Sequence, residues 1–201
     1  MSHHQAAFSD RPHKALRRPV FINPVDWKIQ DSGAIIRNWL TLGEDIAGEV
    51  IEVGDGVSSY TKGQRIIVHL QSLGTSNIRQ AGFQELVISP QSSVAPLPDS
   101  VSYETGVVLP LSVSTATAGL FQSNHLHLYK PSLSPTKKGK TLLVWGGSSS
   151  VGISDIQLAV AAGYDVVATA SENNFHLLKS LGATRDLDTA VLPSWQTLLQ
   201  S

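Results

Sequence analysis

Cysteine is absent from this 201-residue chain. The chain therefore forms no disulfide and none of the thiolate-rich zinc sites that sequence patterns usually reveal, and a reducing, cytoplasmic compartment is expected. Apolar runs of the ~18 residues that span a membrane are also absent. So is an excess of one charge: 15 Lys and Arg against 16 Asp and Glu give a formal net charge of −1. This balance argues against nucleic acid or an anionic membrane as a partner and favours small molecules.

The first half of the chain has the pattern of an irregular β domain. Residues 44–53, 65–70 and 83–89 are β-rich runs, and Asp55-Gly56 between the first two offers a turn where positive φ is needed. Hydrophobic residues make up 41% of the chain, enough for a buried core. From residue 102 to 122 the pattern becomes helical and rich in small residues that allow close packing.

A Pro/Ser/Lys segment at 130–140 is the best boundary signal, and an α/β pattern follows it. The runs at 141–145 and 165–170 are continuously apolar, as in strands of a parallel sheet covered on both faces. Helices are expected at 151–162 and about 173–181. We therefore predict an α/β protein with a mainly β domain over residues 1–125, followed by an α/β domain over residues 126–201.

The loop "GGSSSVG" at 146–152 has the composition of a phosphate-binding turn. Glycines between a strand and a helix let the backbone approach a pyrophosphate, which the first N–H groups of the helix then bind. Gly146, Gly147 and Gly152 are placed for this, although Ser148 stands where the G-x-G-x-x-G pattern has its second glycine. The alternative is that these are ordinary turn glycines of an α/β unit.

The segment "SENN" follows the second apolar strand, where dinucleotide folds select the ribose substituent. Ser171, Asn173 and Asn174 would suit a 2′-phosphate, whereas the carboxylate of Glu172 would repel it or bind a 2′-hydroxyl. The choice between NADPH and NADH stays open on these residues alone. A plain helix cap is the other interpretation.

Four segments carry a family resemblance: "INPVDWKIQ" (22–30), "LGEDIAGEVIEVGDGV" (42–57), "LPLSVSTATAGLFQ" (109–122) and residues 141–171. Together they resemble the zinc-free medium-chain dehydrogenase/reductases, in particular fungal trans-enoyl-reductase-like and quinone-oxidoreductase-like proteins of secondary metabolism. The resemblance implies that residues 1–125 are a GroES-like β domain and that residues 126–201 are an incomplete Rossmann dinucleotide-binding domain. In this family the two domains hold NADPH in a cleft. The resemblance also implies hydride transfer to an activated C=C bond or a quinone, so that the substrate is an enoyl thioester, an enone or a quinone.

The resemblance also implies roles for individual residues. Three segments are expected to bind the cofactor. A loop at its nicotinamide side contains Val25, Asp26, Trp27 and Lys28. The pyrophosphate is expected at Ser148, Ser149, Ser150 and Val151, and the 2′-phosphate at Ser171, Glu172, Asn173 and Asn174. Those expected to line the nicotinamide and substrate cleft are Ser114, Thr115 and Thr117, for which a small-residue packing face is the alternative. No metal is expected, because Glu44 stands where zinc-dependent relatives place a histidine ligand.

The chain also departs from this family's pattern. Related reductases often carry a tyrosine where Ser32 stands, so the catalytic proton donor is unknown. The opening strands of the β domain have no clear counterpart in residues 9–21, which predicts an unpaired sheet edge. Only 61 residues follow Lys140, whereas six strands need on the order of 150.

Two hypotheses for function follow. The first is an NADPH-dependent oxidoreductase in truncated form. The alternative is a catalytically inactive fragment with at most weak binding of a nucleotide or a partner. In either case a short sheet should leave Ile156, Leu158 and Val160 exposed, which favours an oligomer or a carrier or synthase partner.

Overall fold

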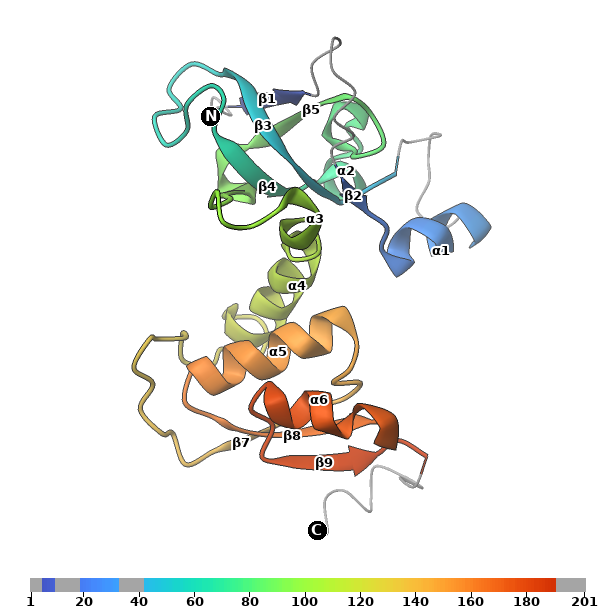
Figure 1. Ribbon diagram of the computed structural model, residues 1–201, viewed down its shortest axis with the longest axis vertical. Helices are drawn as coiled ribbons and strands as arrows, with labels where there is room; N and C mark the ends of the chain where they lie inside the picture. Colours follow the sequence, from blue (N-terminus) through green and yellow to red (C-terminus); the bar gives the residue numbers. More distant parts are fainter. Residues whose placement is uncertain (1–4, 10–18, 33–41, 191–201) are drawn as a thin grey trace. The chain divides into compact units, whose positions relative to one another are not determined.

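The computed structural model describes residues 5–9, 19–32 and 42–190. It divides into two compact units, Met1–Leu111 and Ser112–Ser201 (Figure 1). The predicted domain boundary after residue 125 stays a prediction. Over the described ranges, no helix is both long enough and apolar enough to cross a membrane.

The first unit is built on an antiparallel sheet of six strands in the order β5-β1-β3-β4-β6, with β2 paired to β3. Residues 44–53, 65–70 and 83–89 supply its strands β3, β4 and β5, as predicted. Residue Asp45 of β3 pairs with His69 of β4, and Glu49 pairs with Arg65. The strands are β1 (Gln5–Ser9), β2 (Val20–Phe21), β3 (Asp45–Val53), β4 (Arg65–His69), β5 (Leu86–Pro90) and β6 (Val94–Pro96).

Alternation along β4 explains how this sheet buries its apolar face. Ile66 and Val68 are fully buried, while the residues on either side of them are partly exposed, as the period of two in a strand requires. They pack with Val50 and Leu70 in one hydrophobic cluster. The predicted turn also forms, since the N–H of Val57 donates to the carbonyl of Gly54 across Asp55-Gly56, where Gly56 has a φ of +78°.

The N-terminal strand corrects one sequence expectation. Strand β1 is present and pairs with both β3 and β5, so the opening of the chain contributes an internal strand rather than leaving an edge. The next strand, β2, has only two residues. The segment between them, residues 10–18, lies outside the described residues.

Short helices connect these strands and lead out of the sheet. They are α1 (Pro24–Ser32), α2 (Ser72–Thr75), η1 (Ile78–Gln80), η2 (Gln91–Ser93), α3 (Tyr103–Gly106) and α4 (Pro110–Phe121). The helical pattern predicted for 102–122 is therefore correct but divided in two. Pro110 suits the first position of α4, because that position needs no hydrogen-bonding N–H.

The second unit holds a parallel sheet in the order β7-β8-β9. Its strands are β7 (Thr141–Val144), β8 (Asp165–Ala170) and β9 (Arg185–Asp188), and its helices are α5 (Ser150–Ala161), η3 (Glu172–Asn174) and α6 (Phe175–Ser180). The predicted α/β fold class is confirmed, and a third parallel strand begins at Arg185. The segment 130–140 packs in this unit, where Ser132 and Lys138 donate their N–H groups to the carbonyls of Ala161 and Gly163.

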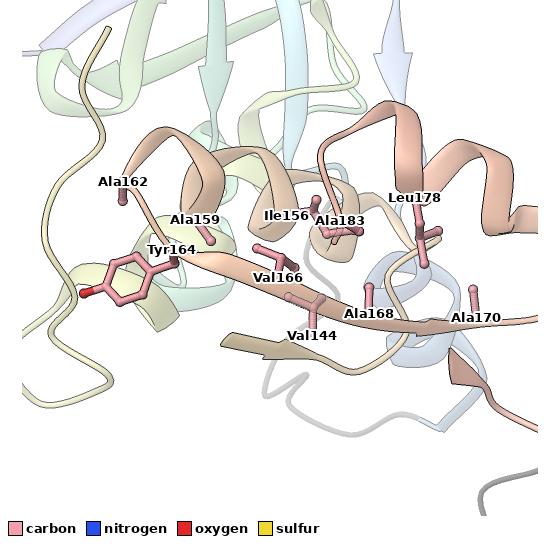
Figure 2. Packing of buried hydrophobic residues seen from close by; sticks show 10 residues of the cluster. All are labelled: Val144, Ile156, Ala159, Ala162, Tyr164, Val166, Ala168, Ala170, Leu178 and Ala183. Carbon is pink, nitrogen blue, oxygen red and sulfur yellow. The ribbon is translucent and has the colours of Figure 1, made fainter. Parts of the chain in front are cut away.

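Figure 2 shows the core of the second unit, where α5 and α6 lie over the sheet. Ile156 and Leu178 are fully buried against Val144, Val166 and Ala168. The expectation that Ile156 is exposed is therefore wrong, because three strands already cover the inner face of α5.

The prediction of exposure also covered two further apolar residues of α5, Leu158 and Val160. Leu158 and Val160 are partly buried, and Val160 packs against the same core. Exposed apolar side chains do occur on β7 and just after it, at Leu143 (40%) and Trp145 (51%).

Candidate nucleotide-binding site

Two glycines of the loop after β7 donate their backbone N–H groups to the neighbouring strand β8. Gly146 has a φ of +75°, a conformation that favours glycine. Its N–H donates to Oγ1 of Thr169 at 2.9 Å, and the N–H of Gly147 donates to the Thr169 carbonyl at 2.8 Å. These contacts set the direction in which the chain turns from the sheet into α5.

Gly152 permits the close approach of α5 to this loop. A Cβ atom at Gly152 would lie 2.4 Å from the carbonyl oxygen of Gly146 and 2.8 Å from the Cα of Gly147. A Cβ at Gly147 would lie 3.0 Å from the Cβ of Ala168. Both glycines are thus required by helix–strand packing, which is one of the roles that glycines have in dinucleotide-binding turns.

The N-terminus of α5 offers donors for an anion. Ser149 caps the helix: its Oγ accepts from the N–H of Gly152 at 3.1 Å and donates to the carbonyl of Gly146 at 2.8 Å. The N–H groups of Ser150 and Val151 lie in the first turn, where the helix supplies no acceptor. Ser149 and Ser150 are exposed and Ser148 is partly exposed. Such an N-terminus is suited to a phosphate group.

The second predicted loop leaves the same edge of the sheet. Val144 of β7 pairs with Ala168 of β8 in parallel register, so the loops that follow these strands are neighbours. Ser171, Glu172 and Asn173 are exposed, and the amide of Asn174 donates to Oγ of Ser171 at 3.0 Å. Ser171 precedes η3 but makes no side-chain cap to a backbone N–H, which weakens the helix-cap interpretation of this segment.

The segment predicted to form a loop is helical instead. The first turns of α1 contain its residues Val25, Asp26, Trp27 and Lys28. Asp26 is buried, and its two carboxylate oxygens accept from the N–H groups of Asn23 (2.8 Å) and Gly43 (2.9 Å). Trp27 is 54% exposed, with the ammonium of Lys28 5.7 Å from its ring centroid. Trp27 and Lys28 are therefore open to a ligand, while Asp26 holds the backbone. Their predicted contact with a cofactor stays a prediction.

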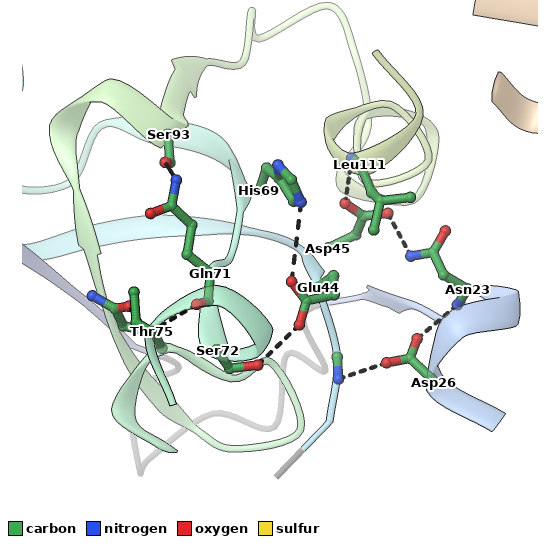
Figure 3. Close-up of polar contacts among 12 residues, drawn as sticks. Asn23, Asp26, Glu44, Asp45, His69, Gln71, Ser72, Thr75, Ser93 and Leu111 are labelled. Atoms are coloured by element: carbon green, nitrogen blue, oxygen red, sulfur yellow. Dashed lines mark hydrogen bonds and ion pairs between the residues drawn. The ribbon is translucent and has the colours of Figure 1, made fainter. Parts of the chain in front are cut away.

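Figure 3 shows a buried polar network beside α1 that sequence reasoning missed. Asp45 is fully buried; its Oδ2 accepts from the amide of Asn23 at 2.8 Å, and its Oδ1 accepts from the N–H of Leu111 at 2.6 Å. Burial raises the pKa of Asp45 to about 6. The available signal was a pair of adjacent acids, Glu44-Asp45, at the start of a β-rich run.

Glu44, expected from the family resemblance to stand in place of a zinc ligand, belongs to the same network. Its Oε1 accepts from the hydroxyl of Ser72 at 2.9 Å, and its Oε2 lies 4.0 Å from Nε2 of His69. Burial, with the nearby charges of Asp26 and Asp45, raises the pKa of Glu44 to about 7. Within the described ranges, no group of three or more His, Cys, Asp or Glu side chains is placed to hold a metal ion.

Helix α4 presents the three predicted cleft residues away from its buried face. Thr115 and Thr117 are exposed and Ser114 is partly exposed, whereas Ser112, Ala116 and Leu120 are buried at a spacing of four. The hydroxyl of Ser154 on α5 donates to Oγ of Ser112 at 3.3 Å. The packing face is therefore formed by other residues, and a role for Ser114, Thr115 and Thr117 at a ligand stays a prediction.

Ser32 ends α1, where its hydroxyl donates to the Lys28 carbonyl at 2.6 Å. This contact gives Ser32 a local role at the end of the helix.

The chain thus combines a β domain with a strand-glycine-loop-helix unit, and comparison with known proteins identifies the family. Residues 18–99 match the alcohol dehydrogenase GroES-like domain. The dehydrogenase orf1 of Aspergillus niger is 47% identical over 171 residues, which cover 83% of this chain and 49% of the relative. The trans-enoyl reductase himH of Aspergillus japonicus is 46% identical over 168 residues, covering 83% and 48%. The chain thus spans about half the length of these curated relatives.

Solved structures give the same assignment. The quinone oxidoreductase of Coxiella burnetii matches with a TM-score of 0.71 at 25% identity, covering 98% of this chain and 56% of that one. A mycobacterial protein complexed with NADPH matches with a TM-score of 0.67 at 25% identity, covering 92% and 51%. This chain belongs to the medium-chain dehydrogenase/reductase superfamily, and its sequence relatives include fungal dehydrogenases and trans-enoyl reductases.

Proposed function

We propose that this chain binds NADPH through the loop between β7 and α5 and serves a zinc-independent oxidoreductase that reduces an activated C=C bond or a quinone. The observation that carries the proposal is the α5 N-terminus, where glycine packing leaves the N–H groups of Ser150 and Val151 open to a phosphate. The names of related reductases and the mycobacterial NADPH complex support the same class of reaction and cofactor.

In this proposal each loop has a defined task. Ser148, Ser149, Ser150 and Val151 bind the pyrophosphate by their N–H and hydroxyl groups, and Ser171, Asn173 and Asn174 receive the 2′-phosphate. NADPH, when bound, supplies the hydride. Without a metal, the protein would promote the reaction by positioning its reactants and by polarising the acceptor carbonyl.

The cofactor is tested by calorimetry of the 201-residue chain with NADPH and with NADH. We expect NADPH to bind more tightly, and replacing Glu172 with alanine should widen the difference, because a carboxylate next to a 2′-phosphate is unfavourable. Glu85→Ala, at an exposed position of the first unit, is the matched control. Equal affinity for the two cofactors in both the wild type and Glu172→Ala would contradict NADPH selection at this loop.

Zinc independence has its own test. Elemental analysis of the purified chain should show no stoichiometric zinc, because Glu44 offers one carboxylate that already accepts from Ser72. One tightly bound zinc per chain would contradict the proposal.

A binding role without turnover is the second candidate, because the described residues supply a loop suited to a phosphate but the sequence identifies none of them as the proton donor. NADPH oxidation, followed by absorbance with a panel of enones, enoyl thioesters and quinones, separates the two candidates. Binding without oxidation of NADPH by any acceptor would support the second.

A further inference from the structure

Reduction of an activated C=C bond, the reaction proposed above, consumes one hydride and one proton. The hydride comes from the cofactor and adds to one carbon, and the enolate that results must take a proton at the other carbon. The donor of this proton needs a pKa near neutral and access to the substrate. The hydroxyl of Ser32 does not qualify, because an alcohol is far less acidic and this one donates to the Lys28 carbonyl.

Glu44 and His69 form an acid–imidazole pair at one end of the first unit's sheet. Glu44 directly precedes β3, His69 ends β4, and Asp45 is the cross-strand partner of His69. Oε1 of Glu44 accepts from the Ser72 hydroxyl at 2.9 Å, while Oε2 lies 4.0 Å from Nε2 of His69 (Figure 3). This separation is longer than a hydrogen bond, as catalytic contacts often are without a substrate.

The two members of the pair differ in their access to solvent. The side chain of Glu44 is 4% exposed, whereas that of His69 is 27% exposed. The imidazole can therefore meet a substrate that the carboxyl group cannot reach. Asp45, whose pKa is also near neutral, has no such outlet, because it is fully buried and its oxygens accept from Asn23 and Leu111.

Burial moves the pKa values of the two groups in opposite directions. It raises the pKa of Glu44 to about 7; Asp26 of α1 and Asp45 of β3 act in the same sense, and the hydrogen bond from Ser72 opposes them. Burial lowers the pKa of His69 from its usual 6.5. At pH 7 the imidazole is therefore mostly neutral, and the proton of the pair belongs to Glu44, which is about half protonated.

We propose that Glu44 and His69 act as one proton-donating pair, in which the buried Glu44 stores the proton and the imidazole of His69 delivers it to the substrate. This assignment rests on the reductase function proposed above. The enolate carbon takes the proton from Nδ1 of His69, and Nε2 takes the proton of Glu44, which is left as a carboxylate. The substrate is reduced by the hydride and this proton, the cofactor is oxidised, and water at the exposed side of His69 returns the proton to the pair.

The first test needs no turnover and uses NMR titration of the full chain. The ring resonances of His69, identified by their loss in His69→Gln, should shift with an inflection near pH 7, because the charge of Glu44 appears there. The inflection should be absent in Glu44→Gln, which keeps the shape of the side chain. Glu85→Gln, at an exposed acid of the same unit, is the control. Identical His69 curves in the wild type and Glu44→Gln would overturn the proposal.

The second test measures proton delivery, with an enone as the acceptor. His69→Gln and Glu44→Gln should each lower kcat about 100-fold, while calorimetry shows unchanged NADPH affinity. The wild-type kcat should fall as the pH rises through about 7, because Glu44 then loses its proton, and Glu44→Gln should lose this dependence. His125→Gln, at an exposed histidine outside the pair, should leave kcat unchanged. Circular dichroism verifies that each variant is folded.

Chemical rescue separates delivery of the proton from a merely structural role. Imidazole added to His69→Ala should restore part of the lost rate, because it replaces the missing proton carrier. Absence of rescue, or an unchanged kcat in His69→Gln or Glu44→Gln, would overturn the proton-donating pair and leave the proposed reductase function standing. A wild type that binds no NADPH, or that binds it and reduces no acceptor, would contradict the proposed function and with it the donor role.

Discussion

The two units bury their polar groups differently. In the first unit, Asp26 of α1 and the pair Glu44 and Asp45 at the start of β3 are buried, and their carboxylates accept from backbone N–H groups, an amide and a hydroxyl. In the second unit, Ser149 and Ser150 lie at the exposed beginning of α5. The buried carboxylates of the first unit therefore stabilise its fold, whereas the first turn of α5 in the second unit is exposed. The predictions below test this difference.

The largest effect is expected in the apolar core of the second unit. Ile156→Ala removes a fully buried side chain packed against the sheet and should lower the free energy of unfolding by about 2–5 kcal/mol. Ile78→Ala, at a half-exposed position of the first unit, should have a much smaller effect. Chemical denaturation followed by circular dichroism measures both. Similar losses for the two variants would show that α5 is not packed as described.

Gly152→Ala should both destabilise the second unit and reduce nucleotide binding. The added Cβ would lie 2.4 Å from a backbone oxygen, so the start of α5 must move away from the loop, at a cost of about 1–3 kcal/mol. Gly119→Ala is the matched control, because a Cβ at this position of α4 would meet no atom within 4 Å. Thermal melting and NADPH calorimetry provide the two measurements. Unchanged nucleotide affinity in folded Gly152→Ala would argue against binding at this loop.

Glu44→Gln should change how stability depends on pH. Because the pKa of Glu44 rises from 4.5 to about 7 on folding, the folded protein holds this proton more tightly than the unfolded chain. Its contribution is therefore most favourable below pH 4.5, declines as the pH rises through about 7, and is constant above. At pH 8 the glutamine variant should be more stable than the wild type by about 1–2 kcal/mol.

The control for this experiment is Glu85→Gln, an exposed acid whose replacement should leave the pH profile unchanged. The pKa of Asp45 is also raised and its charge acts on Glu44, so the difference between the two melting-temperature profiles reports Glu44 together with its coupling to Asp45. A constant difference from pH 4 to pH 8 would show that Glu44 is not perturbed by burial.

The smallest effect is expected at the helix cap. Ser149→Ala removes the acceptor for the Gly152 N–H and should cost about 1 kcal/mol. Ser148→Ala, one residue earlier and outside the cap, should cost less. Chemical denaturation measures the free energy of unfolding of both variants. Equal losses of this free energy would show that the Ser149 cap is not what stabilises the start of α5.

Much of the fold was predictable, because strands and helices are set by short-range patterns. The continuous apolar runs at 141–145 and 165–170 and the glycine loop between them became β7, β8 and the turn into α5. The prediction of a loop at 25–28 was wrong because Asp26 stabilises a helix start by accepting from Asn23 and from the distant Gly43. The exposure predicted for Ile156 was wrong because three strands suffice to cover it.

The sequence by itself determined the order of strands and helices, the glycine turn and the lack of a cysteine-based metal site, since each depends on residues close together in the chain. Only the tertiary structure decided which polar groups are buried. Asn23 and Leu111 meet Asp45 across 22 and 66 residues of sequence, and the pKa of Glu44 rises because folding removes it from water beside two other acids. Burial of a charge depends on contacts between distant residues, which no local pattern specifies.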